Sequence, residues 1–379
     1  MPLFGPSHGY MRLLAPLGIL LVLSACAGRP GPEVLNVVSA KDARTKEVTI
    51  YAATTRTKDT GKDNGFSTGR ADDLNYAKYT ISIPPDHKAS AIEWPKGKPN
   101  AKTDFVVTSE STLTAPVFNK DVTAQQVKRR PIGIFVHGYN YTFQESLFRL
   151  AQMAADANIE ATPVLFSWPS QGALTGYVAD RESVLYSRDY LASLLVSLSA
   201  DQGTGDIILF GHSMGGFLIM ETARQLKLEG RDDVLSKLRI VLAAPDIDAD
   251  VFRKQMDVIG KMKIPINLLV SKDDRALAAS SFLDANHPRV GRLDIDDPQI
   301  REAAVKYGIK VIDITSVKGS DGLGHDRFVS LAKLYPQLAS LDTPTNRRSP
   351  AQVGAFIFDA AGATIASPFR LVSKVVDPQ

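Results

Sequence analysis

Cysteine is nearly absent from this sequence, since Cys26 is the only one in 379 residues. A single thiol cannot form a disulfide within the chain, nor can it supply the several thiolates of a cysteine metal site. The sequence therefore excludes a scaffold held together by disulfides. With 44% hydrophobic residues, a chain of this length can build an ordinary buried core without them.

An excess of one charge sign is also lacking. The chain has 44 Lys and Arg residues against 41 Asp and Glu residues, which gives a formal net charge of +3, and no long run of one sign is present. Proteins that bind nucleic acids usually concentrate basic residues on one face. We therefore expect no nucleic acid partner.

Long apolar stretches that could cross a bilayer as a helix are also lacking. The apolar stretch at residues 13–23 is much shorter than the roughly 20 residues that such a helix needs, and Pro16 interrupts it. Arg12 precedes the stretch and small residues follow it, as is typical of a secretory signal. We expect export of the protein and no permanent transmembrane helix.

The segment "LSAC" at residues 23–26 resembles the lipobox of bacterial lipoproteins, in which the cysteine becomes the acylated first residue of the mature chain. The resemblance implies a signal peptide at residues 1–25, lipidation of Cys26 and a tether at residues 26–45. Acyl chains would hold the protein at a membrane, because each methylene buried in the bilayer contributes about 0.8 kcal/mol to binding. The expected location is the bacterial cell envelope, on the side that faces the periplasm. The alternative is an ordinary exported protein with a chance cysteine at its cleavage site.

Residues 46–130 are expected to form strands and loops that lead into the core. β-branched and aromatic residues alternate with polar ones at residues 46–56 and 76–85, which predicts two strands. Between them, residues 57–73 are rich in glycine and charge, and this composition predicts a loop.

From residue 131 to residue 342, apolar strands alternate with amphipathic helices. The predicted strands are residues 131–140, 162–170, 206–213, 238–248, 265–274 and 309–317. The predicted helices are residues 143–158, 180–201, 215–228, 251–262, 275–283 and 325–341. This alternation predicts an α/β fold, with a mostly parallel sheet covered by helices on both faces.

Residues 343–379 are expected to be a C-terminal linker and tail. The polar segment 343–350 precedes small apolar residues that Asp359 and Pro368 interrupt. Two interpretations stay open, an interfacial or partner-docking helix and a loosely packed extension.

A candidate nucleophile lies in the segment "LFGHSMGGFL" at residues 209–218. Active groups collect at the carboxyl ends of strands in an open parallel sheet, and Ser213 stands between a predicted strand and a predicted helix. Gly211 and Gly215 match the small residues that flank a nucleophile elbow, where the turn from strand to helix is too tight for side chains. The context predicts a reactive Ser213 hydroxyl, which needs an adjacent general base.

Elimination among the six histidines selects the base. His8 lies in the signal region, and His87 precedes the core. His137 lies in the turn after the first core strand, and His212 adjoins the serine with its ring expected to point away from the hydroxyl. Only His325 follows the last predicted strand, through a glycine-containing loop that could carry it over the sheet. His287 is the alternative.

A carboxylate must orient the base and stabilise the imidazolium that forms when the serine gives up its proton. The predicted strand at residues 265–274 ends with two such groups, Asp273 and Asp274. Asp274 is preferred because "DRAL" has the Asp-x-apolar-apolar pattern of an acid turn, and Asp273 remains the alternative. The resulting chain order is nucleophile, acid, base.

Acyl transfer also requires N–H donors for the oxyanion. The backbone N–H of Met214, which follows the nucleophile, is one predicted donor. The backbone N–H of Tyr139, in the turn after the first core strand, is the other. Gly138 lets that turn bend inward, and His137 is expected to brace it.

Residues 131–341 resemble the α/β-hydrolase superfamily. The segments "FVHGYNYTFQES", "FSWPS", "DRES" and "HSMGG" are similar to a branch of bacterial esterase/lipase-like hydrolases of unknown function. The resemblance implies an α/β-hydrolase fold and serine hydrolase chemistry, with no metal and no organic cofactor. Many relatives carry a cap domain before the acid-bearing strand, but only residues 248–264 fill that interval here, so no large cap domain is expected.

The expected function is hydrolysis of a carboxylic ester, of a small molecule or a lipid, through an acyl-enzyme on Ser213. Two alternatives stay open. The same three residues can serve a thioesterase, a peptidase or an acyltransferase. A hydrolase fold without activity can also serve as a binding or scaffold lipoprotein of the envelope. The sequence leaves the oligomeric state open.

Overall fold

The computed structural model describes residues 29–40, 45–59, 65–124, 131–157, 161–200, 204–332 and 370–371. The predicted signal peptide, Cys26, and the predicted tail apart from residues 370–371 lie outside these ranges. Lipidation of Cys26 and the role of the tail therefore stay predictions.

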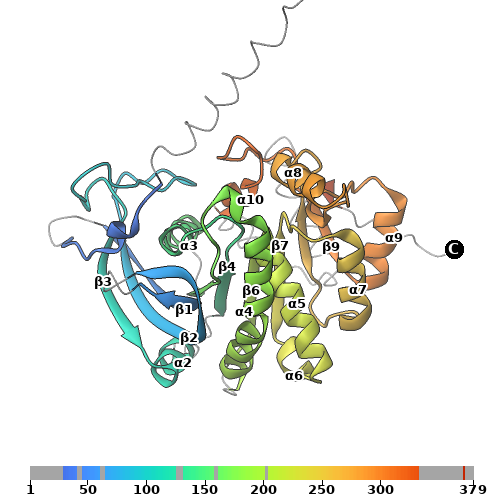
Figure 1. The fold of residues 1–379 in the computed structure, drawn as a ribbon, viewed down its shortest axis with the longest axis horizontal. Coiled ribbons are helices and arrows are strands. Elements are labelled where there is room, and N and C mark those ends of the chain that lie inside the picture. Colours follow the sequence, from blue (N-terminus) through green and yellow to red (C-terminus); the bar gives the residue numbers. More distant parts are fainter. Residues whose placement is uncertain are drawn as a thin grey trace, which may run out of the picture.

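The described residues form one sheet in the order β10-β9-β8-β7-β6-β4-β5-β1-β2-β3 (Figure 1). The strands are β1 (Lys46–Lys58), β2 (Phe66–Ile83), β3 (Val106–Leu113), β4 (Ile132–Val136), β5 (Thr162–Ser167), β6 (Ile207–His212), β7 (Leu238–Ala243), β8 (Asn267–Val270), β9 (Lys310–Asp313) and β10 (Arg370–Leu371). Neighbouring strands from β9 across to β1 are parallel, whereas β2, β3 and β10 add antiparallel edges. The prediction of a mostly parallel α/β sheet is confirmed.

Both faces of the central strands are buried. Along β4, Ile134 and Val136 belong to one hydrophobic cluster and Phe135 belongs to the other. Successive side chains of a strand point to opposite faces, so a strand that is buried on both faces reads as a continuous apolar run. The sequence "IGIFV" of β4 is such a run.

Helices cover the two faces. Helices α2, α4, α5, α7 and α9 contribute to the first cluster, and α3 and α10 contribute to the second. The helices are α2 (Ala115–Ala124), α3 (Phe143–Ala157), α4 (Tyr177–Ser199), α5 (Met214–Leu228), α6 (Asp232–Leu235), α7 (Ala249–Ile259), α8 (Arg275–Leu283), α9 (Pro298–Tyr307) and α10 (Arg327–Ala332). Three short 3-10 helices are η1 (Pro32–Leu35), η3 (Leu174–Gly176) and η4 (Val290–Arg292).

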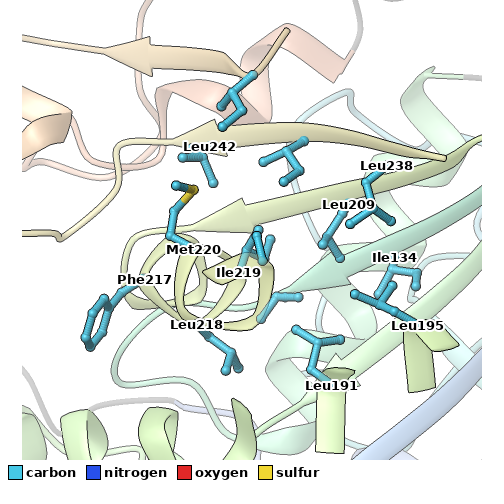
Figure 2. Close-up of a cluster of buried hydrophobic side chains, with 14 of the residues drawn as sticks. Ile134, Leu191, Leu195, Leu209, Phe217, Leu218, Ile219, Met220, Leu238 and Leu242 are labelled. Atoms are coloured by element: carbon cyan, nitrogen blue, oxygen red, sulfur yellow. The ribbon is translucent and has the colours of Figure 1, made fainter. Parts of the chain in front are cut away.

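Helix α5 is held tightly against the sheet. Figure 2 shows its residues Leu218 and Ile219 among Leu209 of β6, Leu191 of α4 and their neighbours in the first cluster. Burying one such side chain contributes about 1.5–3 kcal/mol. The start of α5, and the turn that precedes it, therefore has a rigid base.

The N-terminal strands are longer than the sequence predicts. Strand β1 continues to Lys58 and β2 begins at Phe66, so residues 66–73 of the predicted loop are strand, and that part of the prediction is wrong. Pairing continues through Arg56↔Arg70, with register shifts. Most residues here are at least partly exposed. Their polar composition reflects contact with water, whereas the strand pairing depends on backbone groups that every residue carries. Strand β3 and helix α2 were not predicted.

No separate cap covers the sheet between β7 and β8. The helix in this interval is α7, whose Phe252 and Met256 are buried in the first cluster. Helix α7 therefore packs on a face of the sheet and not over its carboxyl edge. The expectation that the fold lacks a large cap domain is confirmed.

The packing at Gly215 gives a stability prediction. An added Cβ would lie 2.5 Å from the carbonyl oxygen of His137 and closer still to that of Val136. Because backbone atoms of a central strand cannot move away, Gly215→Ala is expected to lower the free energy of unfolding by about 2–3 kcal/mol. Urea unfolding measures this. Gly97→Ala is the control, since an added Cβ there meets nothing within 4 Å, and equal losses in both variants would contradict the prediction.

Candidate active site

The turn between β6 and α5 holds Ser213 in an uncommon backbone conformation. Its φ is 53° and its ψ is −121°, a combination that residues other than glycine rarely adopt. Ser213 N donates to Ala243 O at 3.0 Å, and Gly216 N donates to Ser213 O at 2.9 Å. Because α5 begins at Met214, the serine lies at a helix end that presents unpaired N–H groups and a positive dipole.

Glycines allow this turn to pack closely on its neighbours. A Cβ at Gly211 would lie 2.9 Å from the Gly215 backbone, so a side chain at this position would clash with the first turn of α5. A Cβ at Gly138 would lie 3.0 Å from Ser213 Cβ. The turn after β4 therefore touches the serine, as a source of oxyanion donors must.

Asp274 and His325 follow two different strands, β8 and β9, and meet at the same edge of the sheet. His325 Nδ1 donates to Asp274 Oδ2 at 2.7 Å, and Asp274 is fully buried. The other carboxylate oxygen, Oδ1, accepts from Leu277 N at 2.9 Å and caps the N-terminus of α8. The carboxylate is thus fixed through both oxygens, so it can hold the imidazole ring in one orientation.

His212 connects the loop of His325 to the serine turn. Its Nε2 donates to His325 O at 3.2 Å, and the two ring centroids are 4.6 Å apart. Burial first, and then the neighbouring His325, hold the pKa of His212 well below its ordinary value, so this ring stays neutral. In the described part of the chain, no hydrogen bond joins Ser213 Oγ to His325. Catalytic hydrogen bonds of this kind are often long without substrate and tighten in the complex.

Carboxylates shape the loop that carries His325. Asp326 Oδ1 accepts from the backbone N–H groups of Ser320 and Asp321 at 2.8 and 3.0 Å. Asp321 in turn accepts from His325 N at 3.0 Å. Neither carboxylate was predicted as a site residue from the sequence, although Asp among Gly and Ser is a common turn signal.

The charges around His325 favour its protonated form. Burial lowers the pKa of His325, but the hydrogen bond and charge of Asp274, with the charges of Asp246 and Asp321, outweigh it and raise the pKa above the ordinary value. Asp273, the alternative acid, lies elsewhere. It accepts from Ser271 Oγ at 2.7 Å and from Arg327 Nη1 at 2.7 Å.

The other histidines of the described chain have partners away from Ser213. His87 binds Glu93 and Asp156, and His287 binds Asp248 at 2.9 Å. His137 is buried behind the turn after β4, where its ring stacks on Trp168 with centroids 4.9 Å apart.

His137 braces this turn through both ring nitrogens. Nδ1 donates to Gly138 O at 2.9 Å, and Nε2 accepts from Ser167 Oγ at 3.1 Å. Burial, helped by the nearby charge of Arg56, lowers the pKa of His137 to about 3, so the ring is neutral. Trp168 Nε1 donates to His137 O at 2.8 Å. Trp168 is therefore part of the support of this turn.

Arg56 is a buried residue beside the candidate site that was not predicted from the sequence. It is fully buried and donates from Nε to Ser167 Oγ at 3.0 Å. Its guanidinium also donates to the carbonyl oxygens of Ser67, Ser170 and Tyr141 at 2.9–3.2 Å. Burial lowers its pKa to about 9, although the charges of nearby carboxylates oppose this. One side chain thus joins strand β2 to the segments that follow β4 and β5, and nothing in its local sequence marks it.

Asp180 fixes the outer side of the turn. It accepts from Ser170 Oγ at 2.6 Å, from Gln171 N at 2.7 Å and from Asn140 N at 3.2 Å. The N–H of Asn140 is therefore occupied, whereas that of Tyr139 donates to no residue that the structure describes. Met214, as the first residue of α5, likewise has no acceptor within its helix.

Tyr177 lies next to Tyr139, with ring centroids 5.5 Å apart. Its hydroxyl donates to Asp246 Oδ2 at 2.9 Å. Burial, followed by the charge of Asp246, raises the pKa of Tyr177 to about 12. Asp246 also accepts from Ser280 Oγ and pairs with buried Arg289 at 3.3 Å, so polar and charged groups lie on this side of the site.

The family assignment follows from residues 110–341, which match the model of alpha/beta hydrolases of unknown function (DUF900). This match covers more than half of the chain. The protein belongs to this hydrolase family. The matched range includes the serine turn, Asp274 and His325.

A curated relative is similar over a shorter range. The uncharacterized protein alr1448 of Nostoc sp. (strain PCC 7120) is 28% identical over 154 residues. The match covers 34% of this chain and 39% of that protein, so the chain spans about two fifths of the length of this relative.

Two further findings concern the described ranges only. No helix there is long and apolar enough to cross a membrane. No group of three or more His, Cys, Asp or Glu side chains within those ranges is placed to hold a metal ion.

Removing the Arg56 guanidinium is expected to destabilise the protein. Arg56→Met would remove the donor from one buried and two part-buried carbonyl groups, at a cost of up to about 1–3 kcal/mol each, while it relieves the desolvation of the cation. We expect a net loss of about 2–3 kcal/mol in urea unfolding. Arg239→Met is the control, because Arg239 is exposed and pairs only with Asp206 at the surface. Similar losses in both variants would contradict the role of Arg56.

Proposed function

We propose that this hydrolase cleaves carboxylic esters through an acyl-enzyme on Ser213, with His325 as general base and Asp274 as the acid that orients it. The observation that carries the proposal is the 2.7 Å hydrogen bond between His325 and the buried Asp274, with His212 joining the loop of His325 to the turn of Ser213. The strained backbone of Ser213 supports it, because such conformations cluster at active sites.

The proposed reaction begins when Ser213 Oγ attacks the ester carbonyl carbon and His325 Nε2 takes the hydroxyl proton. The imidazolium is stabilised by Asp274, and the N–H groups of Tyr139 and Met214 donate to the oxyanion. The ester C–O bond then breaks, and His325 gives its proton to the leaving alcohol. Water repeats the sequence on the acyl-enzyme, which releases the acid and restores the serine.

The anchor is part of the proposal. Lipidation of Cys26 would place the enzyme at an envelope membrane on its periplasmic side. Peptide mapping of the membrane fraction tests this, and a mature chain that begins at another residue would contradict it.

Other acyl transfers use the same groups. A series of chromogenic esters of rising chain length, compared with matched thioesters and amides, separates an esterase from a thioesterase or peptidase. If no substrate is turned over and a specific envelope partner co-purifies, the inactive scaffold is the better description.

Labelling by a fluorophosphonate tests the nucleophile. Ser213→Ala should abolish labelling and lower kcat by several orders of magnitude while urea unfolding stays close to that of the wild type. Ser236→Ala is the control, since Ser236 follows α6 and its hydroxyl bonds only to Asp233 O at the surface. Labelling that persists in Ser213→Ala would show that another residue reacts.

The pH dependence tests the acid and base. Only neutral His325 can accept the serine proton, so activity should rise with pH through the raised pKa of His325. Asp274→Asn removes the charge and replaces one of the two acceptor oxygens by an NH2 donor, so the pKa of His325 should fall, the rising limb should move to lower pH, and kcat should drop by about 10⁴. Asp273→Asn, whose carboxylate faces Arg327, should leave the limb in place. A shift in Asp273→Asn alone would reverse the assignment.

A further inference from the structure

The first described residue, Arg29, binds the edge of the candidate active site. Its guanidinium donates to both carboxylate oxygens of Glu145, with Nε at 2.9 Å from Oε1. It also donates to Asn140 Oδ1 at 2.7 Å, to Asn140 O at 2.6 Å and to Gly172 O at 2.8 Å. Asn140 adjoins Tyr139 in the turn after β4, and Gly172 lies in the loop between β5 and η3.

The residues that follow Arg29 extend this contact. Pro30 O accepts from Gln144 Nε2 at 2.8 Å, and Leu35 of η1 is buried in the second cluster. An exposed ion pair alone contributes roughly 0–1 kcal/mol. Here a two-pronged pair is joined by three further hydrogen bonds and a buried anchor, so the chain from Arg29 onward has one defined path beside the site.

This path brings the predicted lipid attachment close to the site. Cys26 precedes Arg29 by three residues. At no more than about 3.6 Å per residue, the Cα of Cys26 lies within about 11 Å of the Cα of Arg29, whatever the conformation between them. Acyl chains on Cys26 would therefore enter the membrane next to the turn of Tyr139, and not on the far side of the molecule.

Exposed apolar side chains stand on elements that carry or adjoin the candidate site, and we call them the apolar rim: Leu174, Val178, Phe282, Leu283 and Leu323. Leu174 and Val178 lie in η3 and the first turn of α4, and they are 68% and 74% exposed. The hydroxyl of Tyr139 donates a hydrogen bond to Leu174 O. This bond joins Leu174 to the turn after β4, which carries the N–H of Tyr139 that we propose as an oxyanion donor.

The rest of the rim comes from the loops of the acid and the base. Phe282, 74% exposed, and Leu283 end helix α8, which Asp274 caps and which lies at this edge of the molecule (Figure 1). Leu323 is two residues before His325. Large exposed apolar patches mark interaction sites. A bilayer fits this rim because the predicted anchor starts beside it.

We propose that the apolar rim rests on the lipid bilayer and that the enzyme takes its ester substrate from that membrane. Contact with Arg29 makes the lipid anchor fix the orientation of the enzyme, so that the edge of the sheet that carries Ser213 faces the headgroups. The inference rests on the proposed lipidation and the proposed ester hydrolysis. The substrate class is thereby narrowed to esters held in or at a lipid surface.

Depth measurements test the orientation without reference to activity. The full-length lipoprotein is reconstituted in phosphatidylethanolamine/phosphatidylglycerol vesicles that contain brominated lipid, after a fluorophore is attached to Val178→Cys or Phe282→Cys. Because Cys26 would be acylated, the introduced thiol is the only free one. Rim residues that enter about 5–10 Å into the interface should be quenched several-fold more than a label in water.

Leu228→Cys is the matched control. Leu228 is 58% exposed and ends α5, about 22 Å along the helix from the serine turn. Inserting 20 Gly/Ser residues between Ala27 and Arg29 should reduce the quenching at the rim, since such a linker spans about 25 Å. Arg29→Ala should reduce it too. Equal quenching at Val178→Cys and Leu228→Cys, or no binding to the vesicles, would overturn the proposal.

Activity measurements distinguish the proposed membrane orientation from the proposed ester hydrolysis. Wild-type and linker-extended proteins are compared on a soluble short-chain ester and on a long-chain ester within the vesicles. The extension should leave the soluble reaction unchanged and slow the vesicle reaction at least severalfold. Equal rates of the two proteins on the vesicle ester would contradict the orientation. Failure on both substrates, with rim quenching intact, would contradict ester hydrolysis alone.

Discussion

The tight passage from β6 into α5 is the constraint on which the rest of the site depends. It holds Ser213 at φ 53° in a conformation that costs energy, and this persists because both flanks are fixed. On one flank α5 is packed into the core (Figure 2). On the other, Gly138 and Gly215 let the end of β4 approach to van der Waals contact. A larger residue at either position would separate the serine from its neighbours.

Buried polar groups transmit that rigidity to the loops. Arg56, Ser167 and His137 form a chain of hydrogen bonds that ends at the turn of Tyr139. Burial lowers the pKa of both ends, to about 3 for His137 and to about 9 for Arg56, so that at neutral pH the imidazole is neutral while the guanidinium keeps its charge. His325 differs from both, since carboxylates surround it and raise its pKa. The candidate site thus contains one imidazole, His325, whose protonated form the carboxylates favour, and another, His137, that burial keeps neutral.

The alternation of apolar strands and amphipathic helices was enough to predict the sheet, because each strand buried on two faces must be apolar throughout. The same reasoning failed at residues 66–73, where a solvated strand has the composition of a loop. It also missed Arg29 and Arg56. Their partners, such as Glu145 and Ser170, are more than a hundred residues away, and no local pattern records a contact made across the fold.

From residue 131 onward, local sequence was sufficient for most of the strands and helices and for the residues that stand at the carboxyl ends of strands, since periodicity and small residues at turns act over a few neighbours. It could place Asp273 and Asp274 together at one strand end but could only prefer one of them by pattern. The fold directs Asp274 to His325 and Asp273 to Arg327, because the helix that Asp274 caps sets the direction of each side chain. Likewise, only the packed molecule brings Arg29 to the edge of the site, since this contact joins segments that the chain keeps far apart.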